Sequence, residues 1–339
     1  MSLQTVLDNL PEFCNDEILK SFIKGYSIVN NHGYKNIVCS ISGGSDSDIV
    51  LDIIHRIDES KKVRYVWFDT GLEYKATKDH LDYLEDRYDI KFERERAIKP
   101  IPLCCKEYGQ PFLSKLASEQ ISRLQKHDFT WEDKPYEELV KSYPECASAI
   151  KWWCNEYTRI NSFDTFSMYD IGRNQWLKEF LIANPPTFKI SSQCCTWAKK
   201  KVAKKIKCDL SIIGVRKAEG GIRAIAYKNC YTSGEEKTDS YRPVFWFTNE
   251  DKQDYEKAFN IVHSDCYTKY GFKRTGCSCC PYGRELEDEL AEIKIHEPLM
   301  YKAVNTVFKD SYEYTRKYKQ FCKKMNAEKE GQISIYNYL

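Results

Sequence analysis

The sequence predicts an α/β protein built on a doubly wound parallel sheet, with a helical insertion and a helical, cysteine-rich C-terminal region. Residues 37–41 form a short apolar run typical of a buried parallel strand, and apolar residues from Ile49 to Ile54 recur at the helical interval. Strand and helix patterns then alternate, as in a parallel sheet covered by helices. The predicted elements are a helix at 16–31, strands at 37–41, 63–68, near 90–93 and at 210–213, and a helix from Thr77 through Tyr88.

A glycine-containing loop joins the first predicted strand to the helix that follows it. Two glycines let the backbone approach an anion closely, and the free N–H groups at the start of a helix carry a partial positive charge. We therefore expect a phosphate chain to bind here, with serine hydroxyls donating hydrogen bonds and Asp46 holding a Mg²⁺ ion. The loop is neither a Walker A sequence nor a GxGxxG motif, and an ordinary glycine turn is the alternative. Its residues are Ser42, Gly43, Gly44, Ser45, Asp46 and Ser47.

The composition of the chain is that of a soluble globular protein. Its 339 residues, 42% of them hydrophobic and 30% charged, are enough for a large core in one or two domains. The sequence has no run of eighteen apolar residues and begins without the basic and apolar regions of a signal peptide, so we expect a cytoplasmic protein that does not associate with membranes. In that reducing compartment, fifteen cysteines favour metal or redox chemistry over disulfides.

Residues from about 106 to 190 interrupt the alternation with long, aromatic-rich, helical stretches. We interpret them as an insertion in a nucleotide-binding domain of residues 1–235, followed by a cysteine-bearing helical region, residues 236–339. Just before the insertion, Cys104 and Cys105 are candidates for redox chemistry or for simple burial. Tryptophans among lysines and arginines can stack on single-stranded nucleic acid, but aromatic residues at helical spacing are more often core, which we favour. These tryptophans are Trp131, Trp152, Trp153 and Trp176.

Later motifs complete a pattern that begins with the loop. They are paired cysteines, a Gly-x-Arg segment ending in Arg-Ala at 214–224, the stretch Tyr-Arg-Pro-Val-Phe-Trp at 241–246, and Gly-Cys-Ser-Cys-Cys at 276–280. The loop resembles the pyrophosphate loop (PP-loop) of the ATP pyrophosphatases, and the whole succession, over residues 36–284, resembles the phosphoadenosine phosphosulfate (PAPS) reductase family. The resemblance implies a Rossmann-like fold of the adenine nucleotide alpha hydrolase-like superfamily, with an adenine nucleotide in the loop.

The resemblance also assigns residues around the nucleotide. Phe68, Asp69 and Thr70 lie in an Asp-Thr-Gly stretch that lines the nucleotide pocket in this family, at a carboxyl strand end, where parallel sheets bind ligands. Arg216 and Arg223 lie in the segment that the family uses beside the nucleotide, and a guanidinium offers a fixed fork of donors to phosphate or sulfate. We expect both arginines, together with the loop aspartate, to act in catalysis.

In the iron-sulfur members of this family, a cysteine pair and a Cys-x-x-Cys motif hold a 4Fe-4S cluster, which the resemblance places on Cys194, Cys195, Cys277 and Cys280. Four thiolates satisfy such a cluster. A tetrahedral Zn²⁺ ion is the main alternative, and buried thiols without metal are another. Cys279, inside the second motif, could replace one of the ligands.

Two departures from the reductases point to the reaction. The chain lacks the C-terminal Glu-Cys-Gly-x-His segment that carries their nucleophilic cysteine, and its last cysteine, Cys322, has no following Gly or His. The chain also keeps Asp46 and Ser47, which the reductases often lose because they bind no pyrophosphate leaving group. Both departures favour an ATP-splitting enzyme like the iron-sulfur phosphorothioation and thiolation members of the superfamily.

We therefore predict an enzyme that adenylates an acceptor with ATP, releases pyrophosphate and transfers sulfur. A nucleic acid is the candidate acceptor, and a protein such as a cysteine desulfurase is the candidate sulfur donor. The first alternative is a PAPS or adenosine phosphosulfate (APS) reductase that produces sulfite with an unusual cysteine, such as Cys154 or Cys322. The second alternative is a nucleotide-sensing subunit of a larger assembly, without catalytic activity.

Overall fold

The computed structural model describes residues 3–8, 10, 15–161, 165–220, 225–234 and 237–336. The chain forms two compact units, and each contains its own cluster of buried apolar side chains. The division predicted at residue 235 separates successive regions of sequence rather than compact units, and it stays a prediction. Unit 1 consists of Met1–Ile98, Ala198–Ser278 and Ile295–Glu297, and unit 2 of Lys99–Trp197, Cys279–Lys294 and Pro298–Leu339.

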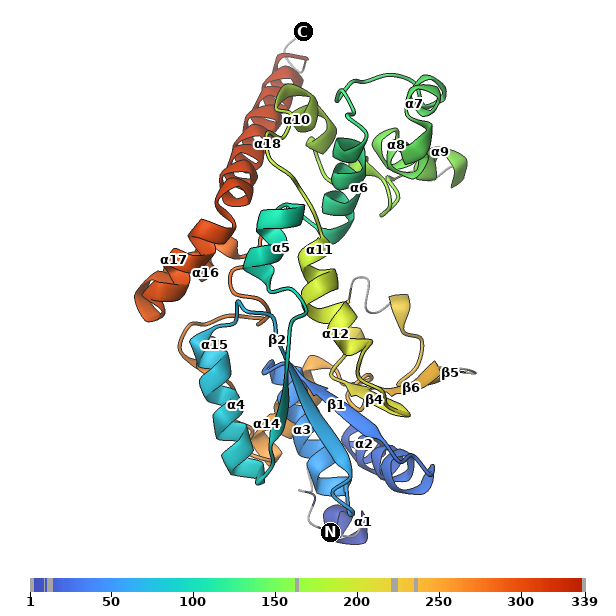
Figure 1. Ribbon diagram of the computed structural model, residues 1–339, viewed down its shortest axis with the longest axis vertical. Helices are drawn as coiled ribbons and strands as arrows, with labels where there is room; N and C mark the ends of the chain where they lie inside the picture. The colour runs from blue at the N-terminus through green and yellow to red at the C-terminus, as the bar shows by residue number, and fades with distance from the viewer. Residues whose placement is uncertain are drawn as a thin grey trace. The chain divides into compact units, whose positions relative to one another are not determined.

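Unit 1 is built on a six-stranded sheet with the order β3-β2-β1-β4-β6-β5 (Figure 1). Neighbouring strands pair in parallel except β5, which runs antiparallel to β6 at one edge. The structure confirms the predicted α/β class and parallel sheet, and it adds an antiparallel edge strand that the sequence did not indicate. The strands are β1 (Ile37–Ile41), β2 (Val63–Asp69), β3 (Phe92–Arg96), β4 (Leu210–Ile213), β5 (Tyr231–Gly234) and β6 (Lys237–Tyr241).

Helices alternate with the first strands of unit 1. The helix α3 connects β1 to β2, and α4 connects β2 to β3. The predicted helix at 16–31 is α2, continued by one wider, π-helical turn at Ser27–Asn31. The helices of this unit include α1 (Leu3–Asp8), α2 (Asp16–Tyr26), α3 (Ser45–Ile57), α4 (Lys75–Tyr88), α12 (Lys201–Ala203), α14 (Asn249–Ala258) and α15 (Asp265–Thr268).

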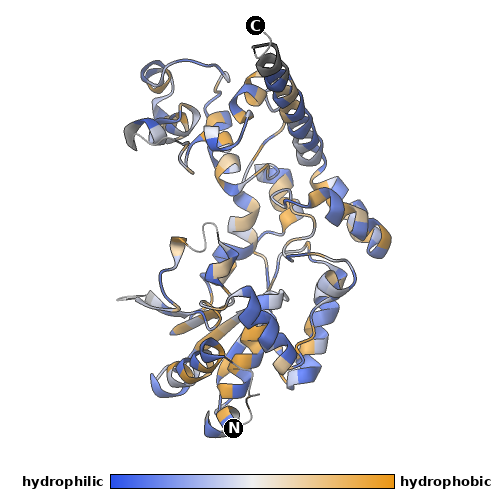
Figure 2. Cartoon of the chain, turned by 180° about the vertical axis from the view of Figure 1, so that it is seen from behind, coloured by the Kyte–Doolittle hydropathy of each residue, from blue (hydrophilic) through white to orange (hydrophobic). Residues whose placement is uncertain are grey.

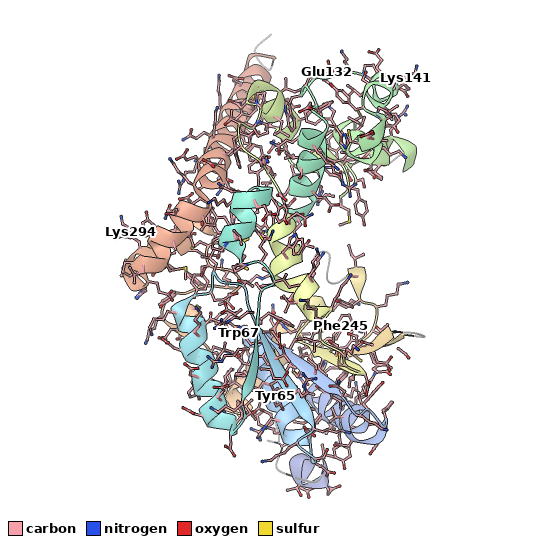
Figure 3. The ribbon with its side chains drawn as sticks, in the orientation of Figure 1. Tyr65, Trp67, Glu132, Lys141, Phe245 and Lys294 are labelled. Carbon is pink, nitrogen blue, oxygen red and sulfur yellow. The ribbon has the colours of Figure 1, made fainter. Side chains whose placement is uncertain are left out.

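The core of unit 1 lies between the sheet and the helices α2, α3, α4 and α14. Ile37, Cys39 and Ile41 of β1 belong to one buried cluster with the apolar residues of α3, at the alternate positions that the two-residue period of a strand requires. Tyr65 and Trp67 of β2 continue the pattern (Figure 3), and Figure 2 shows hydrophobic residues concentrated in these strands and in α3. This packing fixes the positions of the two elements that the loop joins.

Unit 2 is helical, and its core is rich in aromatic residues. Trp152 and Trp153 are fully buried there with Phe112 and Phe180, which confirms the core interpretation for these two tryptophans. No helix in the described ranges is long and apolar enough to cross a membrane, and this includes the 28-residue α18. The helices are α5 (Ile101–Tyr108), α6 (Lys115–Lys126), α7 (Tyr136–Ser142), α8 (Ala147–Trp153), α9 (Glu156–Asn161), α10 (Leu177–Ala183), α11 (Gln193–Cys195), α16 (Leu286–His296), α17 (Pro298–Val307) and α18 (Lys309–Tyr336).

A buried carboxylate, Asp52, ties together three helices of unit 1. It is fully buried in α3 and accepts a hydrogen bond from Arg56 Nε of the same helix at 2.7 Å. The hydroxyls of Tyr88, at the end of α4, and Tyr255, in α14, donate to it at 2.9 and 2.6 Å. A carboxylate can be buried at low cost only when it is fully paired in this way. Asp52 therefore fixes α14 beside α3.

Replacing Asp52 should destabilise unit 1 strongly. We expect Asp52→Ala to lower the free energy of unfolding by about 3 kcal/mol, because it leaves Arg56 and two buried hydroxyls without their acceptor. Urea denaturation followed by circular dichroism measures the loss. Asp86→Ala, at an exposed position of α4, is the control and should change stability by no more than about 0.5 kcal/mol. Equal losses in the two variants would show that the buried network contributes nothing of its own.

Candidate functional site

The loop between β1 and α3 is shaped by close backbone contacts. Gly43 has a φ of +70°, in the left-handed region that favours glycine, and a Cβ atom there would lie 2.8 Å from Thr77 Cγ2. A Cβ atom on Gly214, just after β4, would lie 3.2 Å from the backbone nitrogen of Ser47. The first turn of α3 is therefore in close contact with the backbone that follows β4.

The serine hydroxyls of the loop mainly stabilise the loop itself. Ser47 is 4% exposed, and its Oγ donates to the Gly44 carbonyl at 2.7 Å and accepts from the Gly44 N–H at 3.1 Å. Ser42 Oγ lies 3.2 Å from Ser47 Oγ. The Ser45 N–H donates to the hydroxyl of Tyr267 at 3.2 Å. Ser47, which we expected to contact phosphate, thus has a clear role in holding the loop conformation.

Asp46 lies between two cations at the start of α3. Its Oδ1 atom accepts from Arg216 Nε at 2.9 Å and lies 3.0 Å from Lys252 Nζ. Arg216 also donates through Nη1 to the Thr248 carbonyl at 3.2 Å and to Asn249 Oδ1 at 3.1 Å. The predicted loop aspartate and the predicted arginine are therefore in direct contact, and a lysine of α14 that the sequence did not single out joins them.

A chain of contacts between charged or titratable side chains leads from Lys252 to α4. Glu256 of α14 lies 3.7 Å from Lys252 Nζ and 2.8 Å from His263 Nε2. His263 Nδ1 lies 2.8 Å from Asp48 Oδ2, and His80 Nε2 of α4 lies 3.1 Å from the same oxygen. Burial alone would lower the pKa of His263, but its hydrogen bonds to Asp48 and Glu256 outweigh burial and raise the pKa to about 9. This histidine is therefore protonated at neutral pH.

The segment after β2 is built around a buried threonine. Register places Trp67 of β2 opposite Ile41, the last residue of β1, so the end of β2 at Phe68 and Asp69, and Thr70 after it, lie beside the start of the loop. Asp69 Oδ1 accepts from the Gly71 N–H at 2.9 Å.

Thr70 is fully buried and donates its hydroxyl to the Glu73 carboxylate. Burial raises the pKa of Glu73. The hydroxyl of Thr70 therefore already has an acceptor within unit 1. Of the three residues predicted to line the nucleotide pocket, Phe68 and Asp69 are half-buried.

The predicted cluster cysteines belong to different units. Cys277 is in unit 1, where Thr70 Oγ1 lies 3.8 Å from its sulfur, whereas Cys194, Cys195 and Cys280 are in unit 2. In unit 2 the short helix α11 packs against α5.

That packing brings Cys105 of α5 into contact with Cys194. The Cys194 thiol makes hydrogen bonds with Cys105 and Cys195 and lies within electrostatic range of Cys280, and the contact with Cys105 is the largest effect raising its pKa. Among the described residues, no three or more Cys, His, Asp or Glu side chains are placed so that together they could hold a metal ion. Cys105 is the neighbour that the sequence suggested only as a candidate for redox chemistry.

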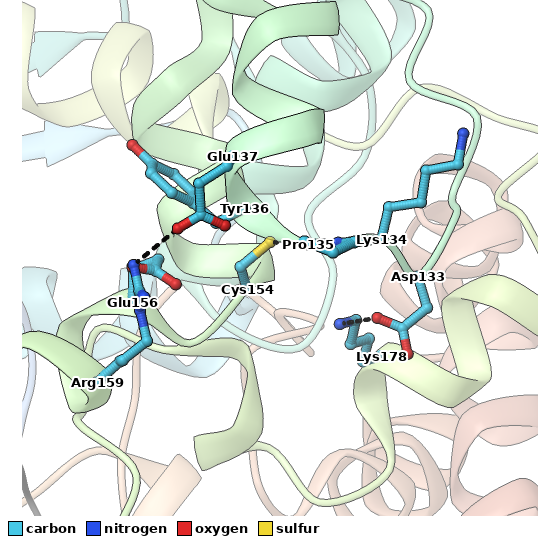
Figure 4. Close-up of a pocket in the computed structure, with 9 residues that line it drawn as sticks. All are labelled: Asp133, Lys134, Pro135, Tyr136, Glu137, Cys154, Glu156, Arg159 and Lys178. Atoms are coloured by element: carbon cyan, nitrogen blue, oxygen red, sulfur yellow. Dashed lines mark hydrogen bonds and ion pairs between the residues drawn. The ribbon is translucent and has the colours of Figure 1, made fainter.

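Cys154 and Cys322, the candidate nucleophiles of a reductase, are not part of this group of cysteines in the sequence. Cys154 lines a pocket of about 420 Å³ in unit 2, together with Lys134 and with the ion pairs of Arg159 and Lys178 with acidic residues (Figure 4). Burial raises the pKa of Cys154 to about 11, and burial also raises the pKa of Cys322. Neither thiol is activated. Arg223, our second predicted arginine, lies outside the described residues.

The mostly parallel sheet, with helices between its strands and a loop at the end of β1, defines an α/β protein. Residues 36–282 match the family model of the phosphoadenosine phosphosulfate reductase domain, so the chain belongs to that family. A comparison with curated proteins gave no match.

Three solved structures are similar at low identity. PAPS reductase from Candida auris, in its phosphate complex, is 12% identical with a TM-score of 0.39, over 81% of this chain and 91% of that one. The U34-tRNA thiolase NcsA from Methanococcus maripaludis, with its 4Fe-4S cluster, is 12% identical with a TM-score of 0.34, over 92% and 82%. NH3-dependent NAD synthetase from Campylobacter jejuni is 13% identical with a TM-score of 0.33, over 93% and 96%. These likenesses are too distant to carry a functional argument.

The protonated His263 should make stability depend on pH. Its pKa is raised in the folded state, so its contribution is fully present below the ordinary value of about 6.5 and is lost as the pH rises through about 9. Relative to His263→Gln, the native protein should lose on the order of 3 kcal/mol of stability across that window. Urea denaturation at pH 6, 7.5 and 9 checks this, with His32→Gln, an exposed histidine, as control. A difference that does not change with pH would contradict the assignment.

Proposed function

We propose that this protein binds ATP in the loop between β1 and α3 and splits it into AMP and pyrophosphate, which activates an acceptor for sulfur transfer. The observation that carries the proposal is the loop itself, with Gly43 in the left-handed region, the first turn of α3 beyond it and Arg216 at that turn. The adenine and ribose would lie near Phe68, Asp69 and Thr70.

The two bond-forming steps of the proposed reaction, adenylation and displacement of AMP, involve no electron transfer. An acceptor oxygen attacks the α phosphorus of ATP, the bond from that phosphorus to the bridging oxygen breaks, and pyrophosphate leaves with the electron pair. Sulfur at the oxidation level of sulfide then attacks the acceptor atom that bears the activated oxygen, and AMP departs with that oxygen. Arg216, held by Thr248 and Asn249, would donate to phosphate oxygens as negative charge moves onto the leaving group. Arg223 is proposed as a second such donor.

Asp46 is the residue that would hold Mg²⁺. Its carboxylate supplies the oxygen ligands that this ion prefers, and its side chain is 15% exposed at the first turn of α3. When bound, the ion would offset negative charge on the phosphates. The Oδ1 atom of Asp46 is shared by two cations, Arg216 and Lys252.

We further propose a 4Fe-4S cluster held by thiols of unit 2. Cys194, Cys195 and Cys280 are the predicted ligands in this unit, and Cys105 adds a fourth thiol in contact with Cys194. The donor chemistry fits, since four thiolates satisfy such a cluster. When bound, the cluster would hold the sulfur to be transferred. The predicted ligand role of Cys277 stays a prediction.

The acceptor is proposed to be a nucleic acid. The sulfur donor is proposed to be a protein such as a cysteine desulfurase, whose persulfide sulfur would take two electrons from a thiol reductant to reach the level of sulfide. The alternative, a sulfonucleotide reductase, needs a thiolate nucleophile near neutral pH. Its candidates here are Cys154 and Cys322, and burial raises the pKa of both thiols. This observation favours the ATP-splitting proposal over the reductase.

Product analysis separates the two reactions. With ATP, Mg²⁺ and nucleic acid as acceptor, the protein should release equal amounts of AMP and pyrophosphate. With APS or PAPS and reduced thioredoxin, it should produce no sulfite, because burial raises the pKa of both candidate thiols, Cys154 and Cys322, and disfavours the thiolate that would form a thiosulfonate. Sulfite production that disappears in Cys322→Ser or Cys154→Ser would establish the reductase instead. Nucleotide binding without either product, across a wide range of acceptors, would favour a sensing subunit.

The cysteine proposal predicts which thiols retain metal. Anaerobically purified and reconstituted protein should bind about four irons per chain. We expect Cys105→Ser to lose iron and the brown absorbance as fully as Cys194→Ser, because both remove a thiolate from one group. Cys104→Ser is the matched control, since the neighbouring Cys104 thiol donates to the Lys99 carbonyl at 3.3 Å. Full iron in Cys105→Ser, with loss in Cys277→Ser, would support the family ligand set; zinc without iron would overturn the cluster.

A further inference from the structure

Lys252 lies at the loop although it comes from a distant part of the chain. Its Nζ atom is 2.5 Å from Ser45 Oγ and 3.0 Å from Asp46 Oδ1, within the first turn of α3. Arg216 Nε is 2.9 Å from the same carboxylate oxygen. Two positive charges therefore meet one negative charge at the first turn of α3.

These charges are held away from bulk water. Arg216 is 7% exposed, and the side chains of Asp46 and Lys252 are 15% and 17% exposed. Attraction between charges strengthens as water is excluded, and so does the penalty for a charge that loses its partner. The Asp46 carboxylate is the partner that both cations share.

Other contacts of α14 also fix the position of Lys252. Glu256, one turn further along α14, lies 3.7 Å from Lys252 Nζ, and His263 lies 2.8 Å from that glutamate. Tyr255 of the same helix donates to the buried Asp52 of α3. Lys252 is therefore held at the loop by the packing and pairing of α14, unlike a surface lysine that merely reaches toward it.

We propose that Lys252 and Arg216 together bind the pyrophosphate part of the nucleotide, and that Asp46 competes with those phosphates for the two cations. A diphosphate group carries more negative charge than one carboxylate, and its oxygens can accept hydrogen bonds from both cations at once. Neutralising Asp46, by a divalent cation or by substitution, would remove the competitor. The inference rests on the proposed function only in taking the loop as the phosphate site.

Binding of inorganic pyrophosphate, measured by titration calorimetry in EDTA and in Mg²⁺, tests this without turnover. For the native protein, Mg²⁺ should strengthen binding at least tenfold. Asp46→Asn should bind pyrophosphate in EDTA at least tenfold more tightly than the native protein does, with little further gain from Mg²⁺. Asp46→Ser gives the same comparison if the asparagine variant does not fold. Weaker or unchanged binding in a folded Asp46 variant would overturn the competition.

Lysine variants test the other half of the proposal. Lys252→Ala should weaken pyrophosphate binding at least tenfold in Mg²⁺ and leave adenosine binding unchanged, and Lys252→Arg should restore part of it. Lys257→Ala, at an exposed position of the same helix, is the control and should bind like the native protein. Native affinity in Lys252→Ala would exclude the lysine from the site.

The outcome is independent of whether the protein turns over. The expected binding pattern without any pyrophosphate release from ATP would support the inference and contradict the proposed reaction. Release of pyrophosphate with unchanged binding in the Asp46 variants would contradict the inference alone. No pyrophosphate binding by the native protein, even with Mg²⁺, would contradict both.

Discussion

The ion pairs of Asp46 with Arg216 and Lys252 determine how unit 1 is assembled around the loop between β1 and α3. A guanidinium as buried as that of Arg216 requires a charged partner, and the carboxylate at the start of α3 supplies it. The arginine follows β4 and the lysine belongs to α14, so a single carboxylate brings two distant segments to the turn after β1. The loop conformation and the position of α14 are therefore set by the same contact.

The charges beyond Lys252 extend this arrangement to α4. Glu256, His263, Asp48 and His80 follow one another, so that each buried carboxylate lies between basic groups. Such alternation lets several ionised side chains be buried together, because each is stabilised by its neighbours. One oxygen of Asp48 is buried without a hydrogen-bond partner among the described residues, so the network is not fully satisfied by protein groups.

The sequence was sufficient for the elements whose signals are local. The strands at 37–41 and 210–213 have the predicted bounds because a buried strand is a short apolar run, and the glycine loop follows from its position after one. Asp46 and Arg216 were both singled out, and the structure brings them together. The edge strand β5 is short and half-exposed, and it carries no such signal.

Other parts of the site depend on contacts between distant residues. Nothing near Lys252 in the sequence distinguishes it from other lysines, because the loop residues that it contacts, Ser45 and Asp46, lie about two hundred residues away. The role of Thr70 was ambiguous for a different reason. A polar residue after a strand can face a ligand or satisfy an internal carboxylate, and only the structure reveals its contact with Glu73. Cys105 likewise gained its significance only from the packing of α5 against α11.

The absence of a side chain at Gly214 has a consequence for the whole loop. A methyl group at this position would lie 3.2 to 3.3 Å from backbone atoms of Asp46 and Ser47. The glycine therefore allows the first turn of α3 to lie close to the segment after β4. A larger residue would require the first turn of α3 or the segment after β4 to shift by a few tenths of an ångström. The direction of the amide groups at that turn therefore depends partly on Gly214, a residue that follows β4 and carries no charge.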